Sequence, residues 1–517
     1  MNSRRTAGLL LLQLAACAGR SRTPTAASSL VATSVTSPSA SPSPAPSVGR
    51  VHVHVVAAPM GARLPARIVV FGLDGTADPN LGPDQQLRGA RNVAVAADGD
   101  VTLDLAPGRY ELNVSHGPEW SLLTEAVTVA EGQRQRVQAT LTHIVPMSDW
   151  TACDLHVHSI VSGDSFVSVE DRVVSLIAEG IEFAAATEHN HIGDYNVALG
   201  AVSRRSSPAF PSLLWAPGVE VTTGGPLGPV GHFNAFPLPA NGEPNGGPPP
   251  WDASPHDIFQ AVRARNPDAV IQVNHPRMQT DIGYFALMGL DAQTNHARSP
   301  LYDSGYDLIE VYNGYFHDSF DDVTRILDDW IALLGTGARY VGTASSDAHV
   351  IARYTAGYPR TYANTPDASA TVANVIAALR GGHAFGTNGP MVFVGNGHAR
   401  AGDTVEVTGD HWAVPVRVLA APWIDVREIR VLGRAGTLAV ANVEPAVGVV
   451  RFDRAITVPV RERSGFVVVT VRGQAPLDRV LPGFHVRPFA FSNPLWYRRA
   501  EPQYLSQSAV DEHAEPH

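Results

Sequence analysis

Three stretches of the chain differ in how apolar and polar residues alternate. Residues 51–145 and the residues after about 395 alternate with period two, as in VHVHVV, ARIVVFG and GFVVVTVRG, and turn sequences such as DG and PGR separate these runs. This pattern predicts half-buried strands in two β-sandwich-like domains. Between them, short apolar runs alternate with amphipathic stretches such as DVTRILDDWIALL, which predicts repeated β–α units.

The middle stretch is expected to form a parallel barrel or a doubly wound sheet, because both faces of its strands are apolar. The candidate strands are TACDLHVH, IEFAAATEH, LLWAPGVEV, HFNAFP, AVIQVNHP, LIEVYNG and YVGTASSDAH. The fold class expected for the chain is therefore multidomain, α/β plus β. The expected segments are a signal peptide (1–17), a disordered Ser/Pro/Ala-rich tether (18–49), an N-terminal β-sandwich (50–147), the α/β domain (148–394), a C-terminal β-sandwich-like domain (395–500) and a polar tail (501–517).

Length and charge narrow the classes of protein. A chain of 517 residues is long enough for two or three domains, and a hydrophobic content of 44% is typical of a folded body. The formal net charge is −11 and the sequence has no basic stripe. This argues against a double-stranded nucleic acid as a partner, because its phosphates need clustered cations. The oligomeric state stays open.

The amino terminus looks like an export signal. Arg4 and Arg5 precede an apolar run that ends in Leu14-Ala15-Ala16-Cys17, which resembles a bacterial lipobox. The resemblance implies that Cys17 is lipidated and anchors the protein to a bacterial membrane of the cell envelope. Residue 18 is Ala rather than Asp, which implies the outer membrane, facing the periplasm. The alternative is a simple signal peptide that is cut after Ala-x-Ala and discards Cys17.

The other cysteine, Cys153, has no partner for an internal disulfide in the mature body. It precedes the stretch DLHVHS, so two interpretations remain: a thiolate ligand, or a small buried apolar residue.

Side chains that bind metals gather at the ends of the middle strands. They are His156, His158, Asp164, Glu188, His189, Glu220, His232, His275, Glu310, Asn313, Asp347 and His349. In β/α folds the carboxyl ends of the strands meet on one face, so these side chains are expected to converge. Residues two apart on a strand point the same way, so His156 and His158 can reach one ion. The similar pair His52 and His54 has no partners nearby in sequence, and we expect it to bind no metal.

Imidazole and carboxylate ligands without thiolate suit zinc, manganese or iron. The candidates exceed the ligands of one tetrahedral site, so two to three divalent ions are implied.

The segments DLHVHS, TEH, GVE, GHF, NHP and SDAH resemble, in order, the PHP (polymerase and histidinol phosphatase) superfamily of metallohydrolases. The resemblance spans the middle domain and looks most like the carbaryl-hydrolase-like branch. It implies a distorted (β/α)7 barrel, here flanked by the two β-sandwich-like domains. The implied ligands of three ions are His156, His158, Glu220 and Asp347; Glu220, His232 and His275; and Asp164, His189 and His349. The chain departs from the family at Glu188, where Asp is common, which puts the spacing of the ions in doubt.

The hypothesis for the reaction is hydrolysis by a metal-bridging hydroxide. Arg277 either clamps an anionic group or forms a surface salt bridge, and Asn313 is a second candidate for orienting the substrate. Asn190 and His191 either contact substrate or cap loops. Glu310 faces the site or a buried partner, and the family pattern gives it no ligand role.

Three functions remain open at this point. The first is a phosphoesterase acting on a small-molecule substrate, because several ions suit a phosphate with several oxygens. The second is a carboxylic or carbamate ester hydrolase, as the branch resemblance implies. The third is a non-catalytic, metal-stabilised binding module.

Overall fold

The computed structural model describes residues 48–205, 212–278, 282–317, 319–366, 370–396 and 398–500. The predicted signal peptide, Cys17, nearly all of the predicted tether and the tail lie outside these residues. Within the described residues, no helix is long and apolar enough to cross a membrane.

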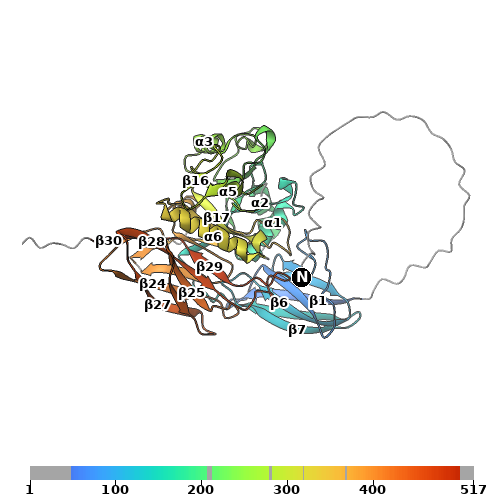
Figure 1. Cartoon of the computed structure of the whole chain (residues 1–517). Helices are drawn as coiled ribbons and strands as arrows, with labels where there is room; N and C mark the ends of the chain where they lie inside the picture. The colour runs from blue at the N-terminus through green and yellow to red at the C-terminus, as the bar shows by residue number, and fades with distance from the viewer. Residues whose placement is uncertain are drawn as a thin grey trace, which may run out of the picture. The chain divides into compact units, whose positions relative to one another are not determined.

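Two four-stranded sheets form the N-terminal part (blue in Figure 1). Alternate residues such as Val51, Val53, Val70 and Leu112 are buried and pack between the sheets. The first sheet contains β1 (Gly49–Ala57), β2 (Ala62–Arg63), β5 (Asp100–Leu105) and β8 (Arg134–Leu141), and the second contains β3 (Ala66–Leu73), β4 (Val93–Ala96), β6 (Gly108–Ser115) and β7 (Leu123–Val129).

The middle part contains two larger sheets with mixed strand directions. The first contains the parallel strands β9 (Trp150–Asp154), β10 (Phe183–Ala186) and β11 (Leu214–Pro217). Next to β9 in this sheet lies β19 (Arg360–Asn364), which is antiparallel both to β9 and to its other neighbour, β20 (Ala384–Thr387). The second contains β12 (Val219–Thr222), β13 (His232–Phe236), β14 (Val270–Val273), β17 (Leu308–Asn313) and β18 (Val341–Ser345). A small hairpin, β15 (Leu290–Asp291) and β16 (His296–Ala297), stands apart from both.

The C-terminal strands extend the first of these sheets. Strand β29 (Phe489–Ser492) pairs with β20, and the sheet continues in the order β28 (Ser464–Arg472), β25 (Glu428–Gly433) and β26 (Gly436–Asn442). Strand β30 (Leu495–Arg499) also pairs with β28, and β23 (Thr404–Val407) pairs with β30. The strands β21 (Met391–Asn396), β22 (Ala399–Arg400), β24 (His411–Leu419) and β27 (Val450–Pro459) form a separate four-stranded sheet.

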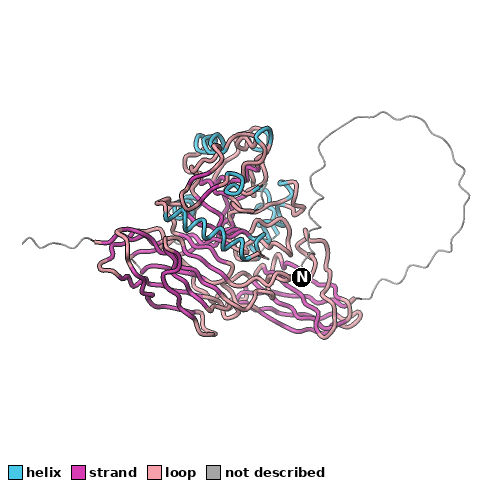
Figure 2. The backbone as a smooth tube through the Cα atoms, viewed as in Figure 1, coloured by secondary structure: helices cyan, strands magenta, loops and turns pink. Residues whose placement is uncertain are grey.

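All six α-helices of the described residues lie in the middle part (Figure 2). They are α1 (Val169–Ala178), α2 (Asn196–Arg205), α3 (Pro255–Arg265), α5 (Tyr284–Met288), α6 (Phe320–Gly335) and α7 (Val372–Arg380). Helix α1 begins where the Ser168 side chain accepts a hydrogen bond from the backbone N–H of Asp171. Helix α6 repeats apolar residues at helical spacing, and it buries Val323, Ile326 and Trp330.

The expected (β/α)7 barrel flanked by two sandwiches is wrong. Strands account for 39% of the described residues and helices for 17%, and six helices do not supply seven β–α units. Strands β12, β13 and β14 pair antiparallel, and so do β9, β19 and β20. The apolar runs predicted strands, but an apolar run carries no information about strand direction. The C-terminal strands, moreover, continue the central sheet instead of flanking it.

Candidate metal centre

Isolated β-bridges lie where the ends of the two middle sheets approach each other. Val157 bridges Ala348 and His189 bridges Glu220. The backbone N–H of His158 donates to Ala348 (3.1 Å), and that of Asp347 donates to His156 (2.8 Å). These contacts place the end of β9 beside the loop after β18, so side chains far apart in the sequence face one another.

The backbone is strained at this junction. His275, Asp347 and Asn190 have positive φ angles of 28°, 51° and 48°. Such conformations are uncommon for residues other than glycine, and they cluster at functional sites.

Four side chains surround one point at the junction. The Nε2 atom of His156 lies 3.3 Å from a carboxylate oxygen of Glu220 and 3.3 Å from one of Asp347. The Nε2 atom of His158 lies 3.3 Å and 3.1 Å from the same two oxygens. Four ligands about 2.0–2.1 Å from an ion in tetrahedral geometry lie about 3.3–3.4 Å from one another. The four nitrogen–oxygen distances match this spacing, and ligand atoms of His156, His158 and Asp347 are close enough to one another for one ion.

A second group lies on the outer side of His158. The Asp164 carboxylate is 3.1 Å from His189 Nε2 and 3.2 Å from His349 Nε2. The His158 ring stacks on both imidazoles, with centroid distances of 4.4 Å and 4.1 Å. His158, Asp164, His189 and His349 together present ligand atoms close enough for one ion.

A third group shares Glu220. His232 Nδ1 and His275 Nε2 lie 3.1 Å and 3.5 Å from its second oxygen. Ligand atoms of His156, Glu220 and His275 are also close enough for one ion, in a combination that sequence reasoning did not give. The structure thus brings all nine predicted ligand residues into one contiguous cluster.

Polar atoms of the cluster that lack a hydrogen-bond partner indicate whether a metal ion fits there. His156 Nε2, His158 Nε2 and Glu220 Oε2 are buried without a hydrogen-bond partner. In the described residues, every ion pair of Glu220 and Asp347 is with a histidine. Buried charges are costly unless they are paired or coordinate a metal, so a divalent cation fits this donor set.

Electrostatics affect the two histidines of the first group differently. Burial opposes protonation of His156, yet Asp347, Glu220 and Glu310 raise its pKa well above the usual value, so a cation that binds there would displace a proton. Burial, together with the nearby His349 and His189, lowers the pKa of His158 to about 3, so its imidazole stays neutral. Burial opposes ionisation of Glu220, yet the surrounding histidines hold the pKa of this carboxyl well below its usual range. Neutral imidazole and carboxylate are the ligand forms that bind metals.

Glu310 orients His156. Its carboxylate lies 3.0 Å from His156 Nδ1 and accepts a hydrogen bond from the His275 backbone N–H at 2.7 Å. A carboxylate on Nδ1 fixes the tautomer whose Nε2 lone pair points into the cluster. The Asn313 amide donates to both Glu310 (2.9 Å) and Asp347 (3.0 Å). Asn313 therefore holds two carboxylates in place.

Glu188, where the chain departs from the family pattern, acts on a neighbouring loop. Its carboxylate accepts hydrogen bonds from the Ser159 side chain (2.5 Å) and the Ser162 side chain (2.6 Å). Ser162 Oγ in turn lies 2.9 Å from His158 Nδ1 and accepts from the His189 backbone N–H at 3.1 Å. The longer carboxylate thus orients His158 through Ser162.

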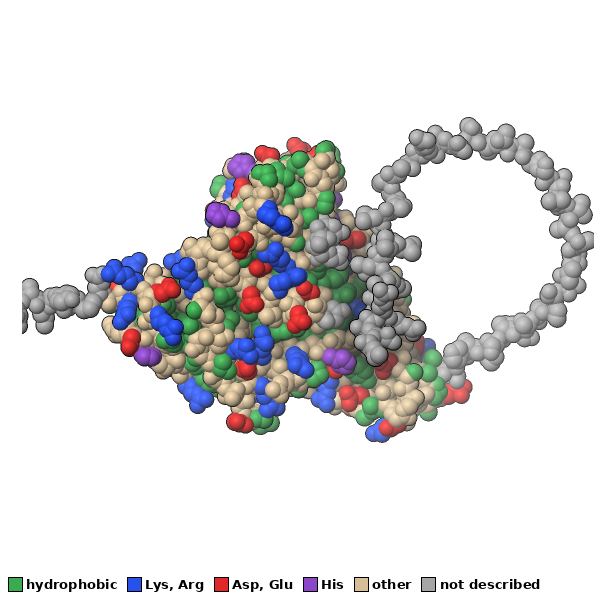
Figure 3. All heavy atoms as spheres, viewed as in Figure 1, with side chains coloured by type: hydrophobic (Ala, Val, Ile, Leu, Met, Phe, Trp, Pro, Cys, Tyr) green, Lys and Arg blue, Asp and Glu red, His purple; other side chains and the backbone are tan. Residues whose placement is uncertain are grey.

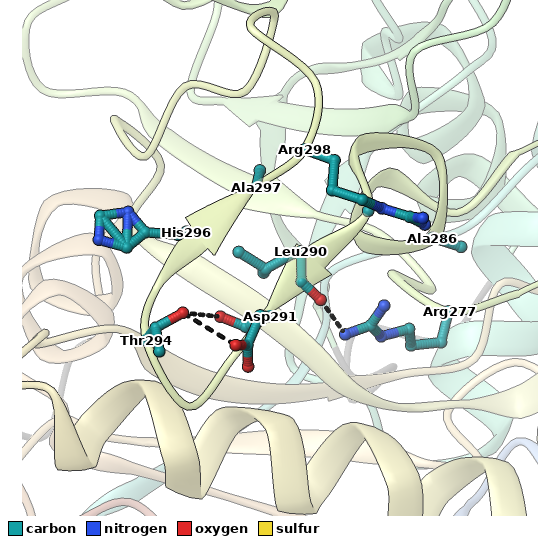
Figure 4. A pocket seen from close by; sticks show the side chains of 9 residues that line it. Arg277, Ala286, Leu290, Asp291, Thr294, His296, Ala297 and Arg298 are labelled. Atoms are coloured by element: carbon teal, nitrogen blue, oxygen red, sulfur yellow. Dashed lines mark hydrogen bonds between the residues drawn. The ribbon is translucent and has the colours of Figure 1, made fainter.

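The candidate substrate-binding residues are less clearly placed for that role. Both polar atoms of the Asn190 side chain bind the backbone of Thr222, and His191 lies half-buried beside it. The Arg277 guanidinium pairs with Asp329 at 2.6 Å and donates to the Leu290 carbonyl (Figure 4). Arg277 lines a pocket that none of the nine candidate ligands lines. The structure therefore contains a salt bridge of Arg277, but both side chains are largely buried, whereas the prediction placed this salt bridge on the surface.

Sequence reasoning missed several buried polar residues around the cluster. Asp154 binds the backbone N–H groups of Ser346 and Gly357, Asn274 donates to Glu220 at 2.9 Å, and Tyr315 lies 3.0 Å from His349 Nδ1. Asp154 stands within the quoted DLHVHS stretch, which was the available signal. Asn274 precedes His275, and nothing in the sequence separates its role from that of other loop residues.

Cys153 lies outside the groups that could hold a metal ion. It is fully buried on β9, its thiol donates to the Thr151 carbonyl, and burial raises the pKa of that thiol well above its usual value. It packs as a small apolar residue.

Comparison with known proteins gives no family. No family model matches the chain, and no curated protein matches it. One solved structure, an amidohydrolase from Chromobacterium violaceum with bound sulfate and no metal, is 16% identical, with a TM-score of 0.29 over 44% of this chain and 96% of that one. The minor pilin GBS52 of Streptococcus agalactiae is 17% identical, with a TM-score of 0.17 over 20% of this chain and 46% of that one. A streptococcal ancillary pilin is 10% identical, with a TM-score of 0.16 over 22% of this chain and 36% of that one.

The chain thus spans less than half the length of either pilin. Similarities at these scores establish neither a shared fold nor a shared activity, and the PHP resemblance stays a prediction from the sequence motifs.

Proposed function

We propose that the protein is a metal-dependent hydrolase that acts on ester bonds. The observation that carries the proposal is the first group: His156 and His158 present buried, unpartnered Nε2 atoms at 3.1–3.3 Å from the carboxylates of Glu220 and Asp347. Divalent ions held there would supply Lewis-acid activation of water and of a substrate oxygen.

Hydrogen bonds within the protein orient the candidate ligands in the absence of substrate. Glu310 on His156 Nδ1 and Ser162 on His158 Nδ1 hold both imidazoles with Nε2 turned toward the carboxylates. Asn313 keeps Asp347 and Glu310 in fixed positions. Ligands held by such outer hydrogen bonds are pre-organised, so little reorganisation is needed during the reaction.

A phosphoester is the leading substrate class. The three ligand groups adjoin one another and share His156, His158 or Glu220, so cations held there would face several oxygens of one tetrahedral group. Manganese, zinc and iron all suit this donor set.

A carboxylic or carbamate ester is the second candidate, and exposed apolar side chains favour it. The loop between His158 and Asp164 exposes Ile160, and Phe166 follows it, with exposed fractions of 55% and 66%. Trp251, 45% exposed, packs over the glycines that follow β12. Such side chains suit an uncharged substrate with an apolar group better than a highly charged one.

Turnover measurements with matched substrates test both candidates. The substrates are p-nitrophenyl phosphate, bis-p-nitrophenyl phosphate and an aryl N-methylcarbamate, each with manganese or zinc and each with the His156→Ala/His158→Ala variant. Metal-dependent cleavage of a phosphate, lost in the variant, is expected. Cleavage of the carbamate alone would favour the second candidate, and tight metal binding without turnover would favour a binding module.

We also propose that Cys17 carries the lipid that anchors the protein to the outer membrane, facing the periplasm. The lipobox-like Leu14-Ala15-Ala16-Cys17 supports this. Incorporation of labelled palmitate, abolished by Cys17→Ser, is the expected result. Equal labelling of both proteins would contradict the anchor.

A further inference from the structure

The loop after β18 carries two candidate ligands and, in the described residues, its strand pairing is limited to the bridge between Ala348 and Val157. Asp347 and His349 lie in this loop, and the next strand, β19, begins only at Arg360. We refer to residues 347–354 as the ligand loop. Its position depends on hydrogen bonds from other parts of the chain, because the second sheet ends at Ser345.

The N-terminal sheets hold the far end of the ligand loop. Asp84, between β3 and β4, accepts a hydrogen bond from the Ala352 N–H on its side chain (2.6 Å) and one from the Ile351 N–H on its backbone carbonyl (3.2 Å). The second carboxylate oxygen of Asp84 binds Arg91 at 2.8 Å, which fixes the rotamer. One aspartate thus satisfies two consecutive amides of a loop that lies 268 residues later.

Arg67 of β3 binds the same residue from the other side. Its buried guanidinium donates to the Ala352 carbonyl (3.1 Å) and to the Val480 carbonyl of the C-terminal part. Both backbone polar groups of Ala352 are therefore satisfied by N-terminal side chains.

The contacts continue without a gap from Ala352 to the candidate ligands. Arg172 of α1 donates to the carbonyls of Val350 (3.4 Å) and His158 (2.7 Å), and so ties the ligand loop to the His156–His158 segment. Ser165 donates to the His349 carbonyl at 2.7 Å. Each residue from 347 to 352 makes such a backbone contact, so Ala352, His349 and Asp347 belong to one continuously held segment.

The C-terminal part touches the ligand loop as well. Tyr354 stacks on Tyr315 with a centroid distance of 4.2 Å, and the Tyr315 hydroxyl lies 3.0 Å from His349 Nδ1. Phe484 lies 5.5 Å from Tyr354. The ligand loop is therefore held between the two accessory parts of the chain.

We propose that Asp84 is a positioning residue of the metal centre, and that the N-terminal sheets set the geometry of the Asp164, His189 and His349 group. This inference rests on the proposed metal centre. Partners outside the ligand shell typically change metal affinity by about 10- to 100-fold when they are removed. The N-terminal part then contributes to the geometry of the metal centre and is not only an attachment domain.

The test compares three variants of the full chain. Asp84→Ala removes the acceptor for Ala352, and Asp84→Asn keeps an oxygen in its place. Asp74→Ala is the control, because it removes an exposed aspartate of the same part, whose ion pair is with Arg109. Two readouts are taken: cobalt(II) affinity with the visible spectrum of the bound ion, and hydrogen exchange at residues 351–352 in the metal-free protein. We expect Asp84→Ala alone to weaken cobalt binding about tenfold, alter the spectrum and speed exchange.

Unchanged cobalt affinity and spectrum in Asp84→Ala, even with faster exchange, would overturn the positioning role and leave a structural one. Cobalt bound by neither the wild type nor any variant would contradict the proposed metal centre itself. If Asp84→Ala does not fold, Arg91→Ala replaces it, because the Arg91 side chain is largely exposed. We then expect cobalt binding about threefold weaker than in the wild type, and equal binding would overturn the proposal.

Discussion

The same His-Val-His tripeptide occurs twice in this protein, on β1 and in the segment that follows β9, in different surroundings. His52 and His54 on β1 lie 3.1 Å and 2.8 Å from Asp100 on β5, so this pair does have a carboxylate, which came from the opposite strand and not from the nearby sequence. Arg63 binds the second oxygen of Asp100, and the His52 side chain is 42% exposed. His156 and His158 instead meet two carboxylates whose ion pairs, in the described residues, are all with histidine.

The comparison shows that a carboxylate near a histidine pair is not enough for a metal site. Asp100 is already neutralised by an arginine and reaches solvent, so it gains little from a cation. Glu220 and Asp347 are buried beside nitrogens that have no hydrogen-bond partner. In the described residues, Glu220 and Asp347 are buried and form no ion pair with arginine or lysine, and this distinguishes the candidate metal centre from the His52–His54 pair.

The largest expected effect comes from removing the His156–His158 pair. His156→Ala/His158→Ala should weaken zinc or manganese binding by more than about 1,000-fold, because two ligands of the first group are lost. His52→Ala/His54→Ala is the matched control and should leave the metal content unchanged. Metal analysis after dialysis measures both. Equal loss in the two variants would break the comparison.

A buried histidine outside the cluster gives the next effect. His116 lies 2.6 Å from the Pro65 carbonyl, and burial lowers its pKa to about 4. Between about pH 6.5 and 4 the unfolded chain binds a proton that the native protein does not, so stability falls as the pH falls, by at most about 3 kcal/mol.

His116→Gln should remove this slope. Urea unfolding at several pH values, with a chelator present, measures it in both proteins. The same slope in both would show that a different group titrates.

Removing the partner of each pair gives a third test. Glu310→Ala takes the carboxylate from His156 Nδ1 and should lower metal affinity by about 10- to 100-fold. Asp100→Ala is its counterpart in the N-terminal sheets and should have no effect. Titration with a competing chelator resolves the two. A similar loss from Asp100→Ala would mean that the exposed pair also binds metal.

The smallest effect is expected at Ser162. Ser162→Ala removes a hydrogen-bond partner of His158 Nδ1 and should cost about 1 kcal/mol, or roughly fivefold in metal affinity. Thr102→Ala changes a residue directly opposite His52 in the sheet and serves as the control. Unchanged affinity in Ser162→Ala would show that Glu188 does not act through this serine.

The strands, and the residues that meet in the candidate metal centre, could be predicted from short-range patterns in the sequence. The period-two runs around Val51 and Val53 and the helical spacing along α6 were readable because each reflects local burial. The (β/α)7 barrel was wrong because strand direction is decided by long-range pairing, as in β12 with β13, and not by the composition of each strand.

Hydrogen bonds between residues far apart in the chain could not be predicted from the sequence. Glu310 is 154 residues from His156, and Asp84 is 268 residues from Ala352. The position of Glu310 near the end of a predicted strand indicated that it faces the site or a buried partner, but not that the partner is His156. Nothing local marks Asp84 as a partner of the ligand loop. On the face drawn in Figure 3, acidic and basic side chains are interspersed.

The buried thiol on β9 has a practical consequence. Cys153 lies on a central strand between β10 and β19, is fully buried and is the single cysteine of the described residues. A thiol reagent can reach it only when these strands separate. The rate of its labelling therefore reports how often the central sheet opens, and comparing that rate with and without zinc would show whether an ion slows the opening.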